Sequence, residues 1–170
     1  MTRLLGIDLG TRRVGLAIAE DGDLRARPLT TIPRRRTTAA DAEALTRIAA
    51  ANGVDELVVG FPLDMRGTEG AMAAETRQWA LDIAHLVDLP VRLRDERLSS
   101  HVAETRVGAA GRGRSGGPPG PVRRAAHRAR VDREAAAVIL EDELEARRHG
   151  TVGELVSPGG QRAMTNEEEA

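Results

Sequence analysis

The sequence predicts an α/β domain: a mixed sheet of five strands, made of an antiparallel meander and two parallel strands, with helices on both faces. Three observations indicate this architecture. The first 33 residues contain three short apolar runs separated by turn residues, as in consecutive antiparallel strands. From residue 39 onward, segments with apolar residues at helical spacing alternate with two further apolar runs. The length of 170 residues fits one domain of ordinary size.

The meander is predicted from three strands at residues 4–9, 14–19 and 24–32. Turn signals separate them, namely Gly-Thr-Arg-Arg at residues 10–13 and Asp-Gly-Asp at residues 21–23. Because both connections are short, neighbouring strands are expected to pair in an antiparallel manner.

The remaining elements alternate in type. Short apolar runs predict strands at 56–60 and 91–93, and helical spacing predicts helices at 39–52, 69–87, 99–110 and 130–148. Residues 108–121 contain six Gly and three Pro in fourteen positions, which predicts a mobile loop. Residues 151–170 are expected to form a disordered acidic tail, so the single folded domain is expected to span residues 1–150.

Composition excludes several classes of protein. The chain has no cysteine, which excludes disulfides, cysteine-ligated zinc and thiol catalysis. No apolar run approaches the roughly 20 residues of a membrane span, and Asp8 interrupts the first apolar run. We therefore expect a cytoplasmic protein without a membrane partner. The only aromatic residues are Phe61 and Trp79, too few for a platform on which unpaired bases stack.

The near-zero net charge conceals a segregation of charge along the chain. Residues 1–36 carry a net charge of +4 and residues 92–133 carry +7, whereas residues 37–91 and 134–170 carry −6 each. All 25 basic residues are arginine, whose guanidinium group suits bidentate contacts with phosphate. The two basic stretches therefore either form a polyanion site or intermix with the acidic ones on folding.

Three acidic residues occupy positions that favour chemistry. Asp8 interrupts an apolar strand, and a buried carboxylate is unfavourable unless something pairs with it. Glu96 follows the fifth strand, where sites collect in open α/β sheets. Asp132 shares the core-facing side of the last predicted helix and is expected near its start. Each also has a structural explanation: a turn contact for Asp8, a charged loop for Glu96, and a helix-end carboxylate for Asp132.

Together the three carboxylates indicate a cage for a hard divalent cation. Mg²⁺ takes one or two carboxylates and keeps waters for a substrate phosphate. Two such ions stabilise the attacking and leaving oxygens of an in-line phosphodiester displacement. We therefore expect Asp8, Glu96 and Asp132 to converge on Mg²⁺ or Mn²⁺ and to be the catalytic residues.

Four ordered motifs then give a resemblance. The motifs are Gly-Ile-Asp-Leu-Gly-Thr at 6–11, Val-Val-Gly-Phe-Pro-Leu at 58–63 with Gly-Thr-Glu at 67–69, Asp-Glu-Arg-Leu-Ser at 95–99, and Val-Asp at 131–132 followed by an apolar run. On these motifs the stretch from about 4 to 144 resembles the YqgF family of pre-16S rRNA nucleases, also described as Holliday-junction-resolvase-like.

The resemblance implies a ribonuclease H-like fold and a metal-dependent nuclease that matures the 5′ end of small-subunit ribosomal RNA. It implies the same catalytic set, Asp8, Glu96 and Asp132. The chain departs from the family at residues 127–130, where His-Arg-Ala-Arg stands in place of the usual lysines. Phosphate binding is expected to survive this change, but a proton transfer by lysine is not.

Three other functions remain open at this stage. The same acids could serve a resolvase of branched DNA, and they could be structural in a non-catalytic RNA-binding protein. The first motif also resembles the phosphate-binding hairpin of actin-like ATPases and sugar kinases. Those proteins need two such domains, however, and 170 residues supply one.

Two further groups of residues are expected to contact nucleic acid. The first comprises the arginines that flank the acids in sequence, namely Arg97, Arg123, Arg124, Arg128 and Arg130. The second is the loop 60–69, in which Gly60, Pro62 and Gly67 suit a backbone contact with the same cleft.

Overall fold

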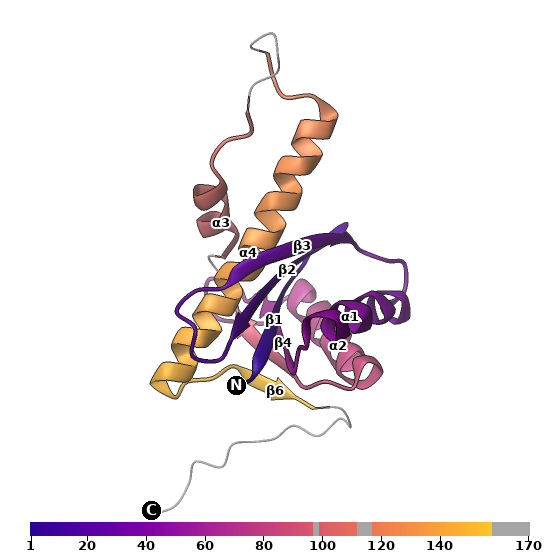
Figure 1. The fold of residues 1–170 in the computed structure, drawn as a ribbon, viewed down its shortest axis with the longest axis vertical. Coiled ribbons are helices and arrows are strands. Elements are labelled where there is room, and N and C mark those ends of the chain that lie inside the picture. The colour runs from indigo at the N-terminus through magenta and orange to yellow at the C-terminus, as the bar shows by residue number, and fades with distance from the viewer. Residues whose placement is uncertain (97–98, 112–116, 158–170) are drawn as a thin grey trace, which may run out of the picture.

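A six-stranded mixed sheet forms the centre of the protein, in the order β3-β2-β1-β4-β5-β6. The computed structural model describes residues 1–96, 99–111 and 117–157 (Figure 1). The strands are β1 (Arg3–Leu9), β2 (Arg13–Glu20), β3 (Arg27–Pro33), β4 (Glu56–Phe61), β5 (Val91–Asp95) and β6 (Glu154–Val156). The helices are α1 (Thr38–Asn52), α2 (Ala71–Val87), α3 (Ser99–Val107) and α4 (Pro121–His149).

The pairing confirms the predicted meander and parallel strands. β1 pairs with β2, and β2 with β3, in an antiparallel manner. β1 pairs with β4, and β4 with β5, in a parallel manner. The carboxyl ends of β1, β4 and β5 therefore meet at one edge of the sheet, where Asp8 and Glu96 lie.

The sheet has one strand more than the sequence predicts. β6 pairs antiparallel with β5, with Leu93 opposite Glu154. The expectation of a disordered tail from residue 151 is therefore wrong for the β6 residues, and the ordered part of the chain continues past residue 150. Three residues give too short a pattern to be read as a strand from sequence, and the edge of β5 supplies their hydrogen bonds. Residues 158–170 of the predicted tail lie outside the described residues.

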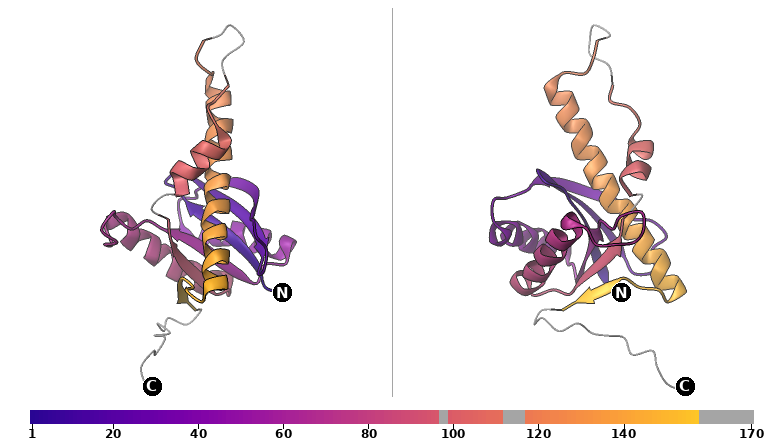
Figure 2. Two further views of the ribbon diagram at one scale, coloured as in Figure 1. Left: turned by 90° about the vertical axis from the view of Figure 1, so that its left-hand side faces the viewer. Right: turned by 180° about the vertical axis from the view of Figure 1, so that it is seen from behind.

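The two faces of the sheet carry different cores because successive strand residues point to opposite sides. Leu5, Ile7 and Leu16 face α1 and α2, whose Leu45 and Ile83 belong to the same buried cluster. On the other face Leu4, Ala17 and Val58 meet Ala136 and Leu140 of α4. The ribbon shows α1 and α2 on one side of the sheet and α4 across the other (Figures 1 and 2).

Glycines on the second face allow α4 to approach the strands closely. A Cβ on Gly15 would lie 2.0 Å from the carbonyl oxygen of Asp132, and one on Gly6 would lie 2.7 Å from that of Ala136. Both neighbours are backbone atoms, so no side-chain rotation could relieve the overlap. These two glycines therefore fix the height of α4 above β1 and β2.

Helix α4 is longer than the sequence predicts. It begins at Pro121 rather than at residue 130, with Gly120 as its N-cap and proline in the first turn. Proline is favoured at this position because the first N–H groups of a helix have no intrahelical partner. Asp132 therefore lies in the helix interior, and the expectation that it sits near the helix start is wrong. Residues 121–128 extend beyond the sheet as an arm, beside α3 (Figure 2), and Thr31 of β3 donates to the Ala129 carbonyl at 2.6 Å where α4 reaches the sheet.

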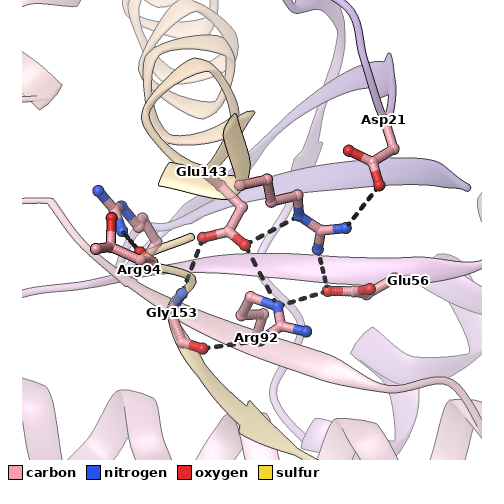
Figure 3. A network of polar contacts seen from close by, with 8 residues as sticks. Asp21, Glu56, Arg92, Arg94, Glu143 and Gly153 are labelled. Carbon is pink, nitrogen blue, oxygen red and sulfur yellow. Dashed lines mark hydrogen bonds and ion pairs between the residues drawn. The ribbon is translucent and has the colours of Figure 1, made fainter. Parts of the chain in front are cut away.

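A buried ion network holds the opposite end of α4. Glu143 is fully buried and accepts from Arg147 Nε at 3.1 Å and from the Gly153 N–H at 3.2 Å, and it lies 3.3 Å from Arg92 Nε (Figure 3). Arg92 also donates to Glu56 at 2.8 Å and to the Gly153 carbonyl at 2.8 Å. The network therefore ties α4, β4 and β5 to the segment that enters β6.

A second buried acid supports the turn between β1 and β2. Asp41 in the first turn of α1 is 1% exposed and accepts from Trp79 Nε1 at 3.1 Å. It also pairs with Arg34 at 3.0 Å, and Arg34 in turn donates to the Gly10 carbonyl at 3.2 Å. This chain of contacts runs from the α1–α2 side of the sheet to the turn that follows Asp8.

Among the described helices, none is both long and apolar enough to span a bilayer.

Replacing Gly15 with alanine should destabilise the fold by about 1–3 kcal/mol, because the new Cβ would overlap the backbone of α4. Urea unfolding followed by circular dichroism measures this change. Gly111→Ala is the matched control, since Gly111 is exposed outside the helices and strands and a Cβ there meets nothing within 4 Å, and we expect it to stay within about 0.5 kcal/mol of the wild type. Equal stabilities for the two variants would contradict the close approach of α4.

Candidate metal centre and nucleic-acid groove

The three predicted acids come from three elements that meet on the α4 face of the sheet. Asp8 is the penultimate residue of β1, opposite Gly15 of β2. Because Gly6 faces α4, the alternation along β1 also turns Asp8 toward α4. Since Gly15 has no side chain, Asp132 of α4 can lie above this pair of strands. The structure thus brings Asp8 and Asp132 close enough for their charges to interact.

Glu96 reaches the same place from the end of β5. Its N–H donates to the Phe61 carbonyl at 3.2 Å, which holds the start of the following segment against the end of β4. Its carboxylate occupies the space above Gly60, where a Cβ would lie 2.1 Å from Glu96 Oε2. Gly60 therefore makes room for Glu96, a role that the sequence did not predict for it.

Asp132 is bound by a residue that the sequence analysis did not single out. The Nε of Arg13, the first residue of β2, donates to Asp132 Oδ2 in an ion pair. The side chains of Arg13 and Asp132 remain 32% and 21% exposed, so the pair opens to solvent. Arg13 could have been found from the strand alternation, because it lies two residues before Gly15 and so shares its face.

The electrostatics of the site show an excess of negative charge. Burial, reinforced by the charge of Asp132, raises the pKa of Asp8 to about 7, although Arg13 acts in the opposite direction. Burial, together with the charges of Asp8 and Asp95, raises the pKa of Glu96 to about 8. Both carboxyl groups would therefore ionise more readily if a cation joined them.

The donor set suits a hard divalent cation, because carboxylate oxygens are the ligands that Mg²⁺ and Mn²⁺ prefer. Asp8 interacts with both of the other acids. Among the described residues, however, no three acidic or histidine side chains already lie together in a ligand arrangement. Asp132 is instead bound by Arg13, so the three carboxylates are neighbours without forming a closed cage.

A groove runs along α4 beside Asp8 and Asp132, in two parts that share Arg13, Arg128 and Asp132 as lining residues. One part, about 560 Å³ in volume, is lined by residues of β1, β2, α3, α4 and the segment after α3 that include Asp8, Arg13, Glu104, Arg128 and Asp132. A second part, of about 390 Å³, is lined by the turn residues 10–13 together with Arg128 and Asp132. The groove thus leads past both Asp8 and Asp132, and Arg128 borders both parts.

The predicted arginines do not share one position. Arg128 lies four residues before Asp132 and so on the same face of α4, in the groove. Arg130 is exposed but lies two residues from Asp132, so it faces elsewhere. Arg123 and Arg124 are exposed near the tip of the arm, where Arg124 donates to the Pro119 carbonyl at 2.6 Å. Arg97 lies outside the described residues.

The loop after β4 is an ordered turn. Asp64 Oδ1 accepts from the N–H groups of Arg66 and Thr68, both at 2.8 Å. Gly67 has a φ of 77°, which favours glycine, and its N–H donates to the Asp64 carbonyl at 2.9 Å. Pro62 is half-buried at the start of this turn. Contact of Pro62 and Gly67 with nucleic acid therefore stays a prediction.

The sequence matches a family model and related proteins over most of its length. A family model described as "RuvX: Holliday junction resolvase" matches residues 2–146. A protein of Anaeromyxobacter sp. (strain K) named "Putative pre-16S rRNA nuclease" is 43% identical over 145 residues, which is 85% of this chain and 98% of that protein. A protein of Chloroflexus aggregans with the same name is 38% identical over 146 residues, covering 86% of this chain and 95% of that one.

Among solved structures, the RuvC protein of T. thermophilus in complex with a Holliday junction substrate has a similar fold. The TM-score is 0.52 at 16% sequence identity, and the match covers 90% of this chain and 99% of that chain. This likeness confirms the ribonuclease H-like arrangement of the sheet. The matches to the family model and to relatives above 30% identity over most of their length show that the chain belongs to the RuvX (YqgF) family of nucleases.

Proposed function

We propose that the protein is a divalent-metal-dependent endonuclease that processes the 5′ end of the pre-16S ribosomal RNA in the cytoplasm. Family and fold imply a nuclease that depends on a divalent metal in general. The choice of Mg²⁺ or Mn²⁺, the catalytic residues and the RNA substrate are our proposal. One observation carries it: Asp8 interacts with both Glu96 and Asp132 beside a groove that is bordered by arginine.

In this proposal Asp8, Glu96 and Asp132 hold the metal. A divalent ion held there would supply Lewis-acid polarisation of the phosphate and activation of a water molecule for phosphodiester hydrolysis. Asp8 is central because it neighbours both of the other acids. Asp8 and Glu96 are half-buried, and the open side of the groove beside Asp8 leaves room for a phosphate backbone.

Arginine side chains would hold the nucleic acid by its phosphates. Arg128 is the best placed of the predicted set, because it borders the groove within one helical turn of Asp132. Arg123 and Arg124 lie farther out along the arm and would reach flanking phosphates. With two aromatic residues among 170, contacts to phosphate rather than base stacking would dominate the affinity.

Branched DNA is the second candidate substrate. The description of the family model and the Holliday junction bound to the RuvC structure favour it. The acids would act in the same way on either nucleic acid, so their geometry does not choose between RNA and DNA.

Cleavage of a precursor of 16S rRNA and of a four-way DNA junction by the purified protein tests the proposal, with and without Mg²⁺ or Mn²⁺. We expect metal-dependent cleavage of the RNA at its 5′ extension and little cleavage of the junction. The reverse preference would support the resolvase. Binding without any cleavage would support a non-catalytic RNA-binding protein.

Asp8→Asn should abolish cleavage while the protein stays folded, because it removes the central charge without changing the side-chain volume. Gel assays of the same RNA and a thermal unfolding curve measure both effects. Asp88→Asn is the matched control: Asp88 is exposed at the end of α2 with a φ of 57°, which asparagine tolerates. Cleavage by Asp8→Asn at the wild-type rate would rule out the proposed site.

Without metal, the stability of the protein should depend on the ionisation of Asp8. The pKa of Asp8 rises on folding from about 4 to about 7, so the folded state binds a proton at Asp8 more tightly than the unfolded state does. The stabilisation of the folded state by this proton is therefore fully present below pH 4 and is lost as the pH rises through 7. In chelator, Asp8→Asn should therefore gain about 3 °C or more in Tm over the wild type between pH 5 and pH 8. A pH-independent difference in Tm would contradict this.

Arg128→Ala should weaken RNA binding more than Arg130→Ala, because only Arg128 borders the groove. Removing one arginine that neutralises a phosphate lowers the slope of log affinity against log salt by about 0.7–0.9. Fluorescence anisotropy at several salt concentrations measures the slope, and Arg130→Ala is the control of equal charge. A smaller slope change for Arg128→Ala than for Arg130→Ala would mean that RNA does not follow this groove.

A further inference from the structure

The ion pair between Arg13 and Asp132 stands at the centre of the candidate metal site. Arg13 binds the one proposed ligand that comes from a helix, while the other two come from the ends of strands. Asp8 is a further neighbour of Arg13, because the guanidinium charge acts on its carboxyl group. A single cation of the chain thus already interacts with two of the three proposed metal ligands.

The position of Arg13 is fixed by the backbone around it. It is the first residue of β2, and its carbonyl accepts from the Gly10 N–H at 2.9 Å across the tight turn. Arg34 anchors the same turn through the Gly10 carbonyl. The base of the side chain is therefore held, while its end lies in the groove, where 32% of it is exposed.

The surroundings allow this pair to separate. Both residues border the 390 Å³ part of the groove, so the guanidinium can leave Asp132 without entering the core. Arg128 borders the same space, and the two arginines together would present positive charge to a phosphate there. Asp132 would then be available to a metal ion that Asp8 also contacts.

We propose that Arg13 is a positioning residue that competes with the divalent cation for Asp132. In the metal-free protein Arg13 offsets part of the negative charge and keeps Asp132 beside Asp8. Binding of the metal requires the guanidinium to leave Asp132 and turn toward the groove. This inference rests on the proposed function, because it concerns the same metal site.

Competition by Arg13 and a purely structural role of Arg13 predict opposite changes in metal affinity when Arg13 is replaced. Loss of a structural ion pair would loosen the site and weaken metal binding. Loss of a competitor strengthens it. Arg13→Gln should therefore bind Mn²⁺ more tightly than the wild type, by about fivefold or more, the lower end of typical coupling between sites. Isothermal titration calorimetry with the metal alone measures this affinity without any cleavage.

Three further variants isolate the cause. Arg12→Gln removes the same charge from the exposed neighbouring residue and should change the Mn²⁺ affinity by less than about twofold, because exposed charges are screened by salt. Arg13→Lys keeps a cation and should restore most of the competition. In an Asp132→Asn background, Arg13→Gln should have no effect on Mn²⁺ affinity, because its target is gone.

The outcomes separate this inference from the proposed function. If the wild type binds Mn²⁺ and Arg13→Gln binds it equally or more weakly, the inference is wrong and the metal site stands. Because Arg13→Gln could fail to fold, thermal unfolding in chelator is measured for it, for Arg13→Lys, and for Asp132→Asn with and without Arg13→Gln. An Mn²⁺ affinity of Arg13→Lys above that of Arg13→Gln would also overturn the inference. If neither the wild type nor any variant binds Mn²⁺, both proposals fail.

Discussion

The close approach of α4 to the sheet is the constraint on which the rest of the structure depends. Gly6 and Gly15 leave no side chain between the strands and the helix backbone, and Ala136 and Ala137 keep the helix side of the contact small. A helix packed at this height carries Asp132 to within reach of Asp8. One more methyl group at Gly15 would meet the carbonyl of Asp132 itself, so the same contact sets both the core and the site.

The two ends of the contact between α4 and the sheet differ in how their acidic residues are paired with arginine. At the end near β6, Glu143 and Glu56 are buried with Arg92 and Arg147, and each acid has arginine partners (Figure 3). At the other end, Arg13 contacts Asp132 and places its charge beside Asp8. Burial and neighbouring acids raise the pKa of Asp8 and of Glu96 there, so a bound cation would favour the ionised form of both carboxyl groups. The first end is suited to holding the helix in place.

The arm formed by the first part of α4 carries arginines that we propose to contact nucleic acid. The helix continues about two turns beyond the sheet, with α3 alongside it (Figure 2). Arg123, Arg124 and Arg128 are exposed on this part of the helix. Because the arm and Asp132 belong to one helix, its arginines lie at fixed positions along the helix relative to Asp132. In the function that we propose, a nucleic acid would lie along the arm and enter the groove.

The sequence by itself determined the meander, the two parallel strands, the helices and the three acids, because these follow from local patterns of apolar residues, turns and strand ends. It could not give β6, since three residues carry no period and the strand exists only because the edge of β5 pairs with it. It misplaced the start of α4, because a glycine- and proline-rich stretch obscured a helix whose first turn accepts proline. The tertiary structure alone decided how the three acids are arranged, the role of Gly60 and the pairing of Arg13 with Asp132. These depend on how closely separate elements pack, and packing height is set by contacts between residues as far apart as 15 and 132, which no local pattern records.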